Sequence, residues 1–202
     1  MARMETENCA KPTSIQQVCK PSLKNTKVEV WDLFIRLFHW SLAAAFAVTY
    51  ITGEEWRKLH VLAGYTAMVL TAARLLWGSI GTAHARFRKF VKSPTAVARY
   101  IRDVFERREA RHVGHNPAGG AMIVVMLALL AAVSASGVLL TTETFWGSET
   151  VDTIHGTLAN VTLICVAVHV SGVIFASVRT RENLVWSMIS GRKRGPGAGD
   201  VV

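Results

Sequence analysis

Cysteine is scarce in this chain of 202 residues, and its three cysteines show no metal-binding spacing. Cys9 and Cys19 lie in a polar N-terminal stretch, whereas Cys165 lies in an apolar one. A zinc finger needs closely spaced pairs of ligands, and covalent c-type haem needs Cys-x-x-Cys-His, which the sequence lacks. Both kinds of site are therefore excluded. The first 30 residues are polar, so we expect no cleavable signal peptide.

Aspartate and glutamate are missing from four long apolar stretches, and the third of these carries no charge at all. A helix needs about 20 predominantly apolar residues to cross a bilayer. The stretches lie at 33–52, 59–78, 118–140 and 154–177. The sequence therefore predicts an all-α integral membrane protein, a four-helix bundle that forms one membrane domain over residues 30–190.

Lysine and arginine are almost absent from the loops that join spans one and two and spans three and four. These loops hold only Arg57 and Lys58, whereas the two tails and the loop 79–117 hold 19 basic residues. Because positively charged loops stay in the cytoplasm, both termini are predicted to be cytoplasmic. This placement assigns the net charge of +9 to a membrane surface rather than to nucleic acid.

The segments outside the spans differ in character. Residues 1–29 are predicted to form a cytoplasmic tail, and residues 191–202, which are rich in glycine, a disordered one. In the loop between spans two and three, Pro94 precedes apolar residues at helical spacing with arginines on the other faces. This pattern predicts a basic amphipathic helix on the inner leaflet. Asn116 and Pro117 suit the N-cap and the first position of the third span.

Four histidines lie in the predicted spans and form two pairs by depth. His155 and His169 are 14 residues apart, so a helix places them on one face, about 21 Å from each other. The span directions put His39 at the depth of His169, nearer the cytoplasm, and His60 at the depth of His155. A histidine inside hydrocarbon is costly and usually faces a partner or a cofactor. The four histidines therefore predict two ligand sites stacked across the membrane.

Two histidine pairs at two depths suit two b-type haems, each with one imidazole on either face. We therefore expect two haem b groups per chain, with His39/His169 and His60/His155 as the iron ligands. Iron with six ligands has no open position, which favours electron transfer over oxygen binding. Small residues near the ligands would give a flat macrocycle room beside its helix. They are Gly64, Gly156 and Gly172.

Two arginines inside the spans are candidates for pairing with the propionates of the inner haem. Arg36 lies one turn from His39, and Arg74 follows His60 by the 14 residues that also separate the histidines of span four. An arginine can bind a carboxylate through two hydrogen bonds. The alternative for both is snorkelling to the inner headgroups. The loop histidines are expected to be solvated or to serve a helix start or the headgroups: His84, His112 and His115.

The opening of span one, Val30-Trp-Asp-Leu-Phe-Ile-Arg36-Leu-Phe-His39-Trp40, resembles the bacterial cytochrome b561 / nickel–iron hydrogenase b-type cytochrome family. The likeness continues through Leu59-His60 with Gly64, through residues 114–119, and through the two histidines of span four. It covers about residues 30–190. The resemblance implies a four-helix cytochrome whose chain crosses the bacterial inner membrane several times. It also implies two b haems held from spans one, two and four, which maps onto the four histidines named above.

The resemblance further implies partners, because family members exchange electrons between membrane quinone and redox proteins such as hydrogenases and cytochromes c. We expect membrane lipid, quinone or quinol, and a redox protein, either a cytochrome c or an oxidoreductase subunit; a homodimer stays open. The chain lacks the fifth span of some hydrogenase-associated members, which favours a partner other than a hydrogenase.

Two other functions remain open. One is a superoxide:quinone oxidoreductase, for which only Arg57 and Lys58 offer a cationic entry near the outer haem. The other is a metal transporter that uses the histidines as zinc or copper ligands. Such a transporter would need acidic or thiolate side chains along the path of the ion through the membrane, and the four spans contain only Cys165 of these kinds.

Overall fold

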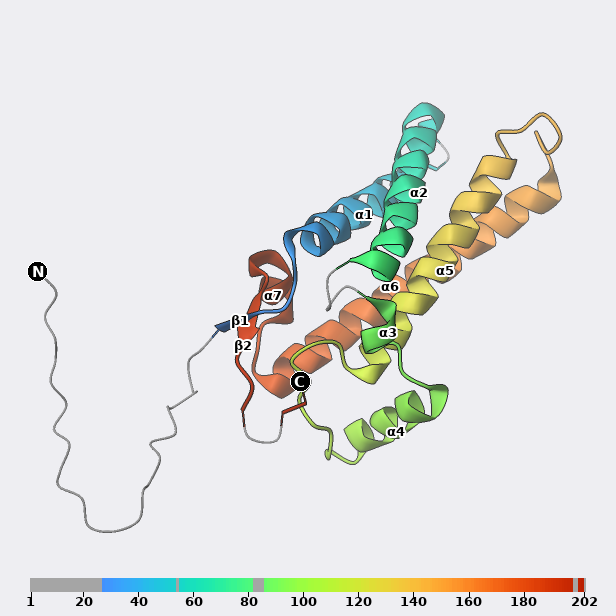
Figure 1. The fold of residues 1–202 in the computed structure, drawn as a ribbon. Coiled ribbons are helices and arrows are strands. Elements are labelled where there is room, and N and C mark those ends of the chain that lie inside the picture. The colour runs from blue at the N-terminus through green and yellow to red at the C-terminus, as the bar shows by residue number, and fades with distance from the viewer. Residues whose placement is uncertain (1–26, 54, 82–85, 198–199, 202) are drawn as a thin grey trace, which may run out of the picture.

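The computed structural model describes residues 27–53, 55–81, 86–197 and 200–201. Within them, the four predicted spans are confirmed as long apolar helices (Figure 1). They are α1 (Leu33–Thr52), α2 (Arg57–Ile80), α5 (Pro117–Leu139) and α6 (Glu149–Thr180). Most of the predicted N-terminal tail, with Cys9 and Cys19, and the loop residue His84 lie outside the described residues.

The spans α1, α5 and α6 begin where a short polar side chain accepts a hydrogen bond from the first helical turn, whereas α2 begins after Trp56 without such a cap. At the start of α1, the Asp32 carboxylate accepts from the Ile35 N–H at 2.8 Å. The predicted cap of the third span is confirmed, because the Asn116 side chain accepts from the Gly119 N–H at 2.6 Å. Pro117 is the first residue of that helix, where its missing N–H costs nothing. Local sequence alone therefore places the start of these helices.

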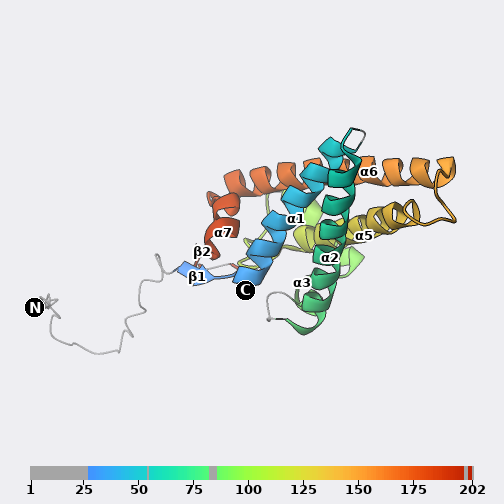
Figure 2. The ribbon, with the colours of Figure 1, turned by 90° about the horizontal axis from the view of Figure 1, so that it is seen from above.

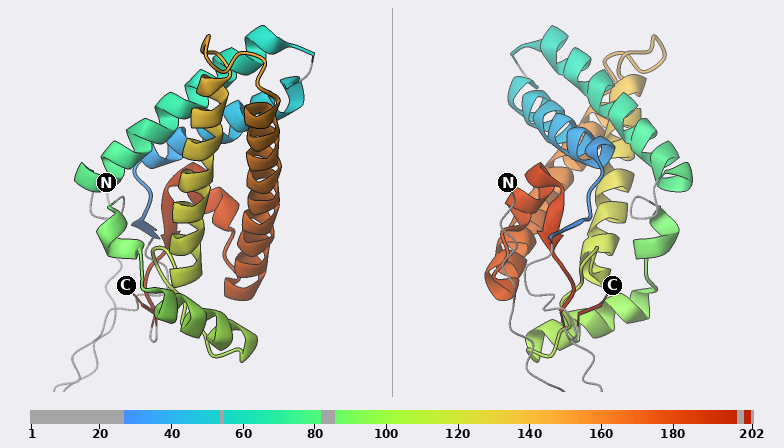
Figure 3. Two further views of the ribbon diagram at one scale, coloured as in Figure 1. Left: turned by 90° about the vertical axis from the view of Figure 1, so that its right-hand side faces the viewer. Right: turned by 60° about the vertical axis from the view of Figure 1, so that its left-hand side comes forward.

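The four long helices form two antiparallel hairpins that cross each other (Figures 2 and 3). α1 packs along α2, α5 packs along α6, and α2 also contacts α5. Among the described residues, α6 makes no extensive contact with α1 or α2. In the most apolar stretch of α6, only 6% of the residues are buried inside the protein, against 22% for α2. Helix α6 is thus held mainly by α5, and most of its apolar surface lies outside the helix packing.

Both described ends of the chain meet at one end of the bundle. β1 (Lys27–Glu29) pairs antiparallel with β2 (Arg192–Arg194), which follows the short helix α7 (Leu184–Ser190). Residues 192–194 are therefore a strand, where the sequence predicted a disordered tail. The two strands come from opposite ends of the chain, so no local sequence pattern predicts that they pair.

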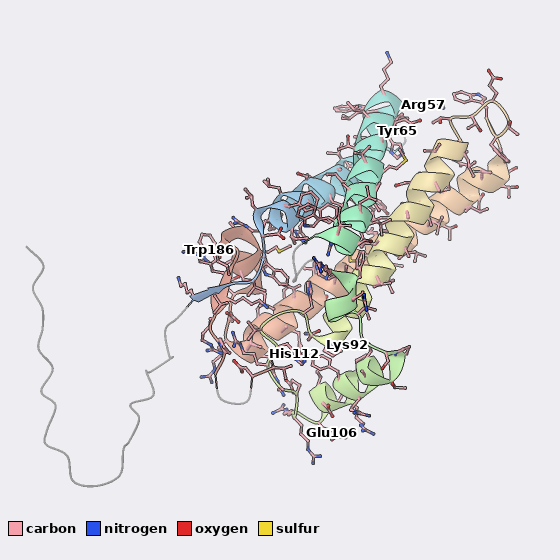
Figure 4. All side chains as sticks on the ribbon, in the orientation of Figure 1. Arg57, Tyr65, Lys92, Glu106, His112 and Trp186 are labelled. Atoms are coloured by element: carbon pink, nitrogen blue, oxygen red, sulfur yellow. The ribbon has the colours of Figure 1, made fainter. Side chains whose placement is uncertain are left out.

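We call the end that carries this sheet the basic end, and the end that carries the α1–α2 and α5–α6 connections the far end. Figure 4 shows Arg57 and Tyr65 toward the far end and Lys92, Glu106 and His112 at the basic end. The basic loops and the C-terminal segment therefore share one end of the bundle.

The loop between α2 and α5 forms α3 (Phe87–Phe90) and α4 (Pro94–Phe105) at the basic end. The Ser93 hydroxyl caps α4 by accepting from the Ala96 N–H at 3.3 Å. α4 packs against α5 and lies across the bundle end (Figure 3). Its outer side exposes Phe105, which is 83% exposed, beside arginines. The predicted helix is confirmed, and its contact with the inner leaflet stays a prediction.

A cluster of ion pairs ties the C-terminal segment to the loop before α5. The Arg111 guanidinium donates to the Glu182 carboxylate at 2.9 Å and also to the Asp200 carboxylate. Burial would raise the pKa of Glu182, but hydrogen bonds from the Arg194 N–H and from Arg111 outweigh burial and lower that pKa. The Gly197 N–H, and then Arg111, lower the pKa of Asp200 against the effect of burial. We call Arg111, Glu182 and Asp200 the clasp.

Arg111→Ala is expected to release the C-terminal segment at neutral pH. Backbone hydrogen exchange in residues 192–197 should become at least about tenfold faster, because a charge-assisted hydrogen bond contributes about 1.5–3 kcal/mol. Arg108→Ala, which removes only an exposed pair with Glu106, is the matched control and should change nothing.

The clasp should also respond to acid. Both carboxyl pKa values are lowered by folding, so the stabilisation is complete above the unfolded values of about 4. It is lost as the pH falls through the lowered folded values. Limited proteolysis across pH would report the release of the segment. Release in the wild type already near pH 6 would contradict the assignment.

Candidate functional site

The structure brings the four span histidines together as two facing pairs between α6 and the first hairpin. At the basic end, the rings of His39 on α1 and His169 on α6 have centroids 6.5 Å apart. At the far end, the rings of His60 on α2 and His155 on α6 have centroids 6.1 Å apart. We call these the basic-end pair and the far-end pair. They are the two pairings that the span directions predict.

Both ring separations fit one metal ion held between two imidazoles. An imidazole nitrogen binds a transition metal at about 2 Å, and the ring centroid lies about 1 Å further away. Two rings on opposite sides of one iron therefore have centroids about 6 Å apart. Along α6, the 14 residues between the two histidines correspond to about 21 Å. The geometry leaves room for one iron in each pair.

Hydrogen bonds orient both rings of the far-end pair. Nδ1 of His60 lies 2.8 Å from the Thr49 carbonyl oxygen, and Nδ1 of His155 lies 3.1 Å from the Val133 carbonyl oxygen. A carbonyl oxygen only accepts, so each Nδ1 carries the proton and donates it. The Ser136 hydroxyl lies 3.0 Å from the same nitrogen of His155. In a neutral ring with its proton on Nδ1, Nε2 is the nitrogen that can bind a metal.

The far-end pair lines a cavity between α1, α2, α5 and α6 that has about 720 Å³ of empty space, part of it open to the surroundings. Gly64 lines this cavity, as does Gly137 on α5. A Cβ on Gly137 would lie 3.0 Å from the His155 ring, so the absence of a side chain lets that ring lie against α5. Gly156 and Gly172 line neither described cavity and have open space around them.

His39 of the basic-end pair lines a second cavity, with about 470 Å³ of empty space and a more polar wall. Arg74, Asp32 and His115 all line it. Arg74 is only 4% exposed, and its guanidinium carbon lies 5.1 Å from the centre of the Phe87 ring. A buried cation thus lies beside His39, where a cofactor with carboxylate groups would need one.

Arg36 is placed elsewhere. Its guanidinium donates to the Ile189 carbonyl oxygen in α7, and the side chain does not line the basic-end cavity. Gly191, at a φ of +79°, allows this approach, because a Cβ there would lie 3.2 Å from the guanidinium. Of the two arginines predicted to face propionates, the structure brings Arg74 to the cavity and ties Arg36 to the C-terminal helix.

Several residues of the site escaped the sequence reasoning. His115 was expected to be solvated or to serve a helix start, but it lines the basic-end cavity. Asp32 lines the same cavity and also caps α1, although the sequence reasoning gave it no role at the site. At the far end, the carbonyl of Thr49 and the hydroxyl of Ser136 orient the ligand rings. A backbone carbonyl leaves no trace in the sequence, whereas His115 does lie in the 114–119 segment that carries the family resemblance.

Four long apolar helices with paired histidines between them define a class: multi-pass membrane proteins whose helices bring imidazole side chains together in pairs. Residues 30–191 match the family model described as prokaryotic cytochrome b561, and the chain belongs to that family. Membership confirms the resemblance that the sequence indicated. It implies haem b and transmembrane electron transfer, so the protein is a membrane cytochrome.

Curated relatives carry the same kind of name. The protein named probable Ni/Fe-hydrogenase B-type cytochrome subunit from Rhodobacter capsulatus is 23% identical, over 84% of this chain and 82% of its own length. The proteins of the same name from Rhizobium leguminosarum bv. viciae and Bradyrhizobium diazoefficiens are 22% and 23% identical, over 85% and 83% of this chain and 91% and 86% of their own lengths. No solved structure matches the chain.

Proposed function

We propose that this protein is a di-haem b-type cytochrome that carries electrons across the bacterial inner membrane, between the quinone pool and a redox partner. The observation that carries the proposal is the facing of His39 with His169 and of His60 with His155 at separations that suit one iron each. The pairs are about 21 Å apart along α6. Two such sites cover most of a hydrocarbon core about 30 Å thick, so an electron would cross it in two steps.

Each residue of the proposed site has one task. Bound haem supplies the reversible one-electron change of its iron. The four histidines would hold the two haems, one pair to each, and such ligation suits electron transfer rather than oxygen binding. The carbonyls of Thr49 and Val133 accept from Nδ1 of the far-end rings and so orient both rings. Arg74, which lines the basic-end cavity, would supply positive charge for the propionates of the basic-end haem.

We assign the basic end to the cytoplasm. The described sheet, α4 and the C-terminal segment share that end, together with most of the lysines and arginines of the chain. Positively charged loops remain on the cytoplasmic side. The far-end pair then lies near the outer face, and residues 30–190 act as one membrane-embedded cytochrome domain.

The proposed partners are a quinone and a redox protein. The curated relatives are named probable Ni/Fe-hydrogenase B-type cytochrome subunits. These names support an oxidoreductase subunit as the partner, and a hydrogenase is again one of the candidate partners. No described contact favours the superoxide reaction; Arg57, one of its two candidate cations, lies with its guanidinium 4.3 Å from the centre of the Trp146 ring. In the part of the chain that the structure describes, no three histidine, cysteine or acidic side chains gather around a metal position. Paired imidazoles suit haem better than transport of a bare ion.

The proposal is tested by the dithionite-reduced minus air-oxidised spectrum of the detergent-purified protein, with haem quantified per chain. We expect low-spin b haem at about two per chain. Adding a quinol to the oxidised protein should then reduce both haems. One haem per chain would show that one histidine pair binds none, and a protein without haem would overturn the proposal.

A further inference from the structure

The two cavities that the histidine pairs line differ in charge. The basic-end cavity has Arg74 and Asp32 in its wall, whereas no charged side chain lines the far-end cavity in the described part of the chain. Arg57, a cation of the far end, lies with its guanidinium 4.3 Å from the centre of the Trp146 ring and does not line the cavity. Any described side chain of this wall that binds the carboxylates of a far-end haem is therefore an uncharged donor.

Two tyrosines bring hydroxyl groups to the wall of the far-end cavity, Tyr50 from α1 and Tyr65 from α2. They are 41% and 40% exposed, so both lie at the edge of the cavity and not in its buried floor. Tyr65 lies toward the far end of the bundle (Figure 4). Burying a carboxylate costs much more than burying an apolar ring, so the carboxylates of a haem are best placed at such an edge.

The protons of the two hydroxyls are engaged differently. The Tyr50 hydroxyl donates to the side-chain oxygen of Asn160 at 2.9 Å. The Tyr65 hydroxyl lies 3.3 Å from the Thr141 hydroxyl oxygen. Because Thr141 donates its own proton to the Val138 carbonyl oxygen at 2.8 Å, Tyr65 is the donor of this longer bond.

The bond from Tyr65 to Thr141 is weak enough to be replaced. Hydrogen bonds between oxygens usually have lengths of about 2.7–2.8 Å, so 3.3 Å is long. A carboxylate is a stronger acceptor than a hydroxyl, because a hydrogen bond to a charged oxygen is roughly twice as strong as one to a neutral oxygen. A carboxylate beside Tyr65 would therefore take over its proton, whereas Tyr50 already has a well-placed acceptor.

We infer that Tyr65 is a binding residue of the far-end haem: its hydroxyl donates to a propionate carboxylate of that haem in place of its long bond to Thr141. The inference rests on the proposed function, because it requires haem between His60 and His155. The two ends of the protein then hold propionates by different chemistry. A guanidinium serves the basic end, and a neutral hydroxyl serves the far end.

The test is a potentiometric titration of both haems in Tyr65→Phe, which removes only the hydroxyl. A donor to a propionate offsets part of the negative charge near the iron and so favours ferrous iron. Its loss should lower the ferrous-to-ferric ratio of the far-end haem about threefold at a fixed potential, because a hydroxyl dipole offsets only a fraction of one charge. At about 59 mV per tenfold change for one electron, this is about 28 mV. The basic-end haem is the internal reference, and His169→Ala, which removes one basic-end ligand, identifies which wave belongs to which haem.

Two further variants separate binding from packing. Tyr50→Phe removes the other tyrosine hydroxyl of the cavity, whose proton is held by Asn160, and should shift neither haem. Thr141→Val removes the partner that Tyr65 has in the structure. If Tyr65 only tied α2 to the end of α5, Thr141→Val would have the same effect as Tyr65→Phe. If Tyr65 binds the propionate, Thr141→Val keeps the wild-type potential.

The comparison also decides if Tyr65→Phe purifies without the far-end haem. A Thr141→Val protein that keeps this haem at the wild-type potential then supports the inference, and an equal loss of haem overturns it.

The outcomes for the inference and for the proposed function can be told apart. An unchanged far-end potential in Tyr65→Phe, or an equal shift in Thr141→Val or in Tyr50→Phe, overturns the role of Tyr65 while the wild type still holds two haems. A wild-type protein that does not hold two haems overturns the proposed function itself.

Discussion

The double variant His155→Ala/His169→Ala is expected to purify as a helical membrane protein without haem. Both residues lie on α6, and each faces the histidine of another helix, so the variant removes one ligand from each proposed iron. Helix α1 packs directly against α2, and α5 packs directly against α6, so the fold should survive. Haem per chain should fall from about two to near zero, measured beside the far-ultraviolet circular dichroism spectrum.

The single variants test the pairing itself. His39→Ala and His169→Ala should each leave about one haem with the same spectrum, and His60→Ala and His155→Ala should leave the other. His112→Ala is the control, because that ring lies in the basic-end loop against Tyr100. If His39→Ala and His60→Ala gave the same remaining spectrum, the pairing by depth would be wrong.

Arg74→Leu is expected to lower the midpoint potential of the basic-end haem while the far-end haem keeps its own. Arg74 is buried at the cavity that His39 lines, and a nearby positive charge favours ferrous over ferric iron. At a distance of about 8 Å and an effective dielectric constant of about 20, one charge contributes about 2 kcal/mol. The ferrous-to-ferric ratio at a fixed potential should therefore fall roughly 30-fold.

Arg36→Leu is the matched control for the charge. Its guanidinium is bound to the Ile189 carbonyl oxygen and does not line the cavity, so the potential should move much less. Arg74→Lys keeps the charge and should recover most of the wild-type value. A larger shift in Arg36→Leu than in Arg74→Leu would reverse the assignment of the two arginines. No shift in either would remove both from the proposed propionate site.

The experiments on the clasp and the measurements of the haem potentials report on different parts of the molecule. The clasp lies at the basic end and joins the C-terminal segment to the loop before α5. Arg74 lies within a span, on the buried face of α2. A variant of the clasp should therefore leave haem content unchanged, and this makes Arg111→Ala a useful control for effects on the site.

The sequence by itself determined the elements whose cause is local. Four runs of about 20 apolar residues require helices, because a backbone inside hydrocarbon must satisfy its own hydrogen bonds. Asn116 and Pro117 marked the start of α5 for reasons of local chemistry. The spacing of His155 and His169 on one helix, together with the span directions, was enough to pair them with His39 and His60.

Only the tertiary structure decided what depends on contacts between distant segments. It separated Arg74, at the cavity, from Arg36, at the Ile189 carbonyl, although both are single arginines within apolar spans. It brought His115 to the cavity and paired β1 with β2 from opposite ends of the chain. It also set the hydrogen bonds that orient the far-end rings, because a carbonyl becomes an acceptor for a given side chain only when two helices pack at a particular register.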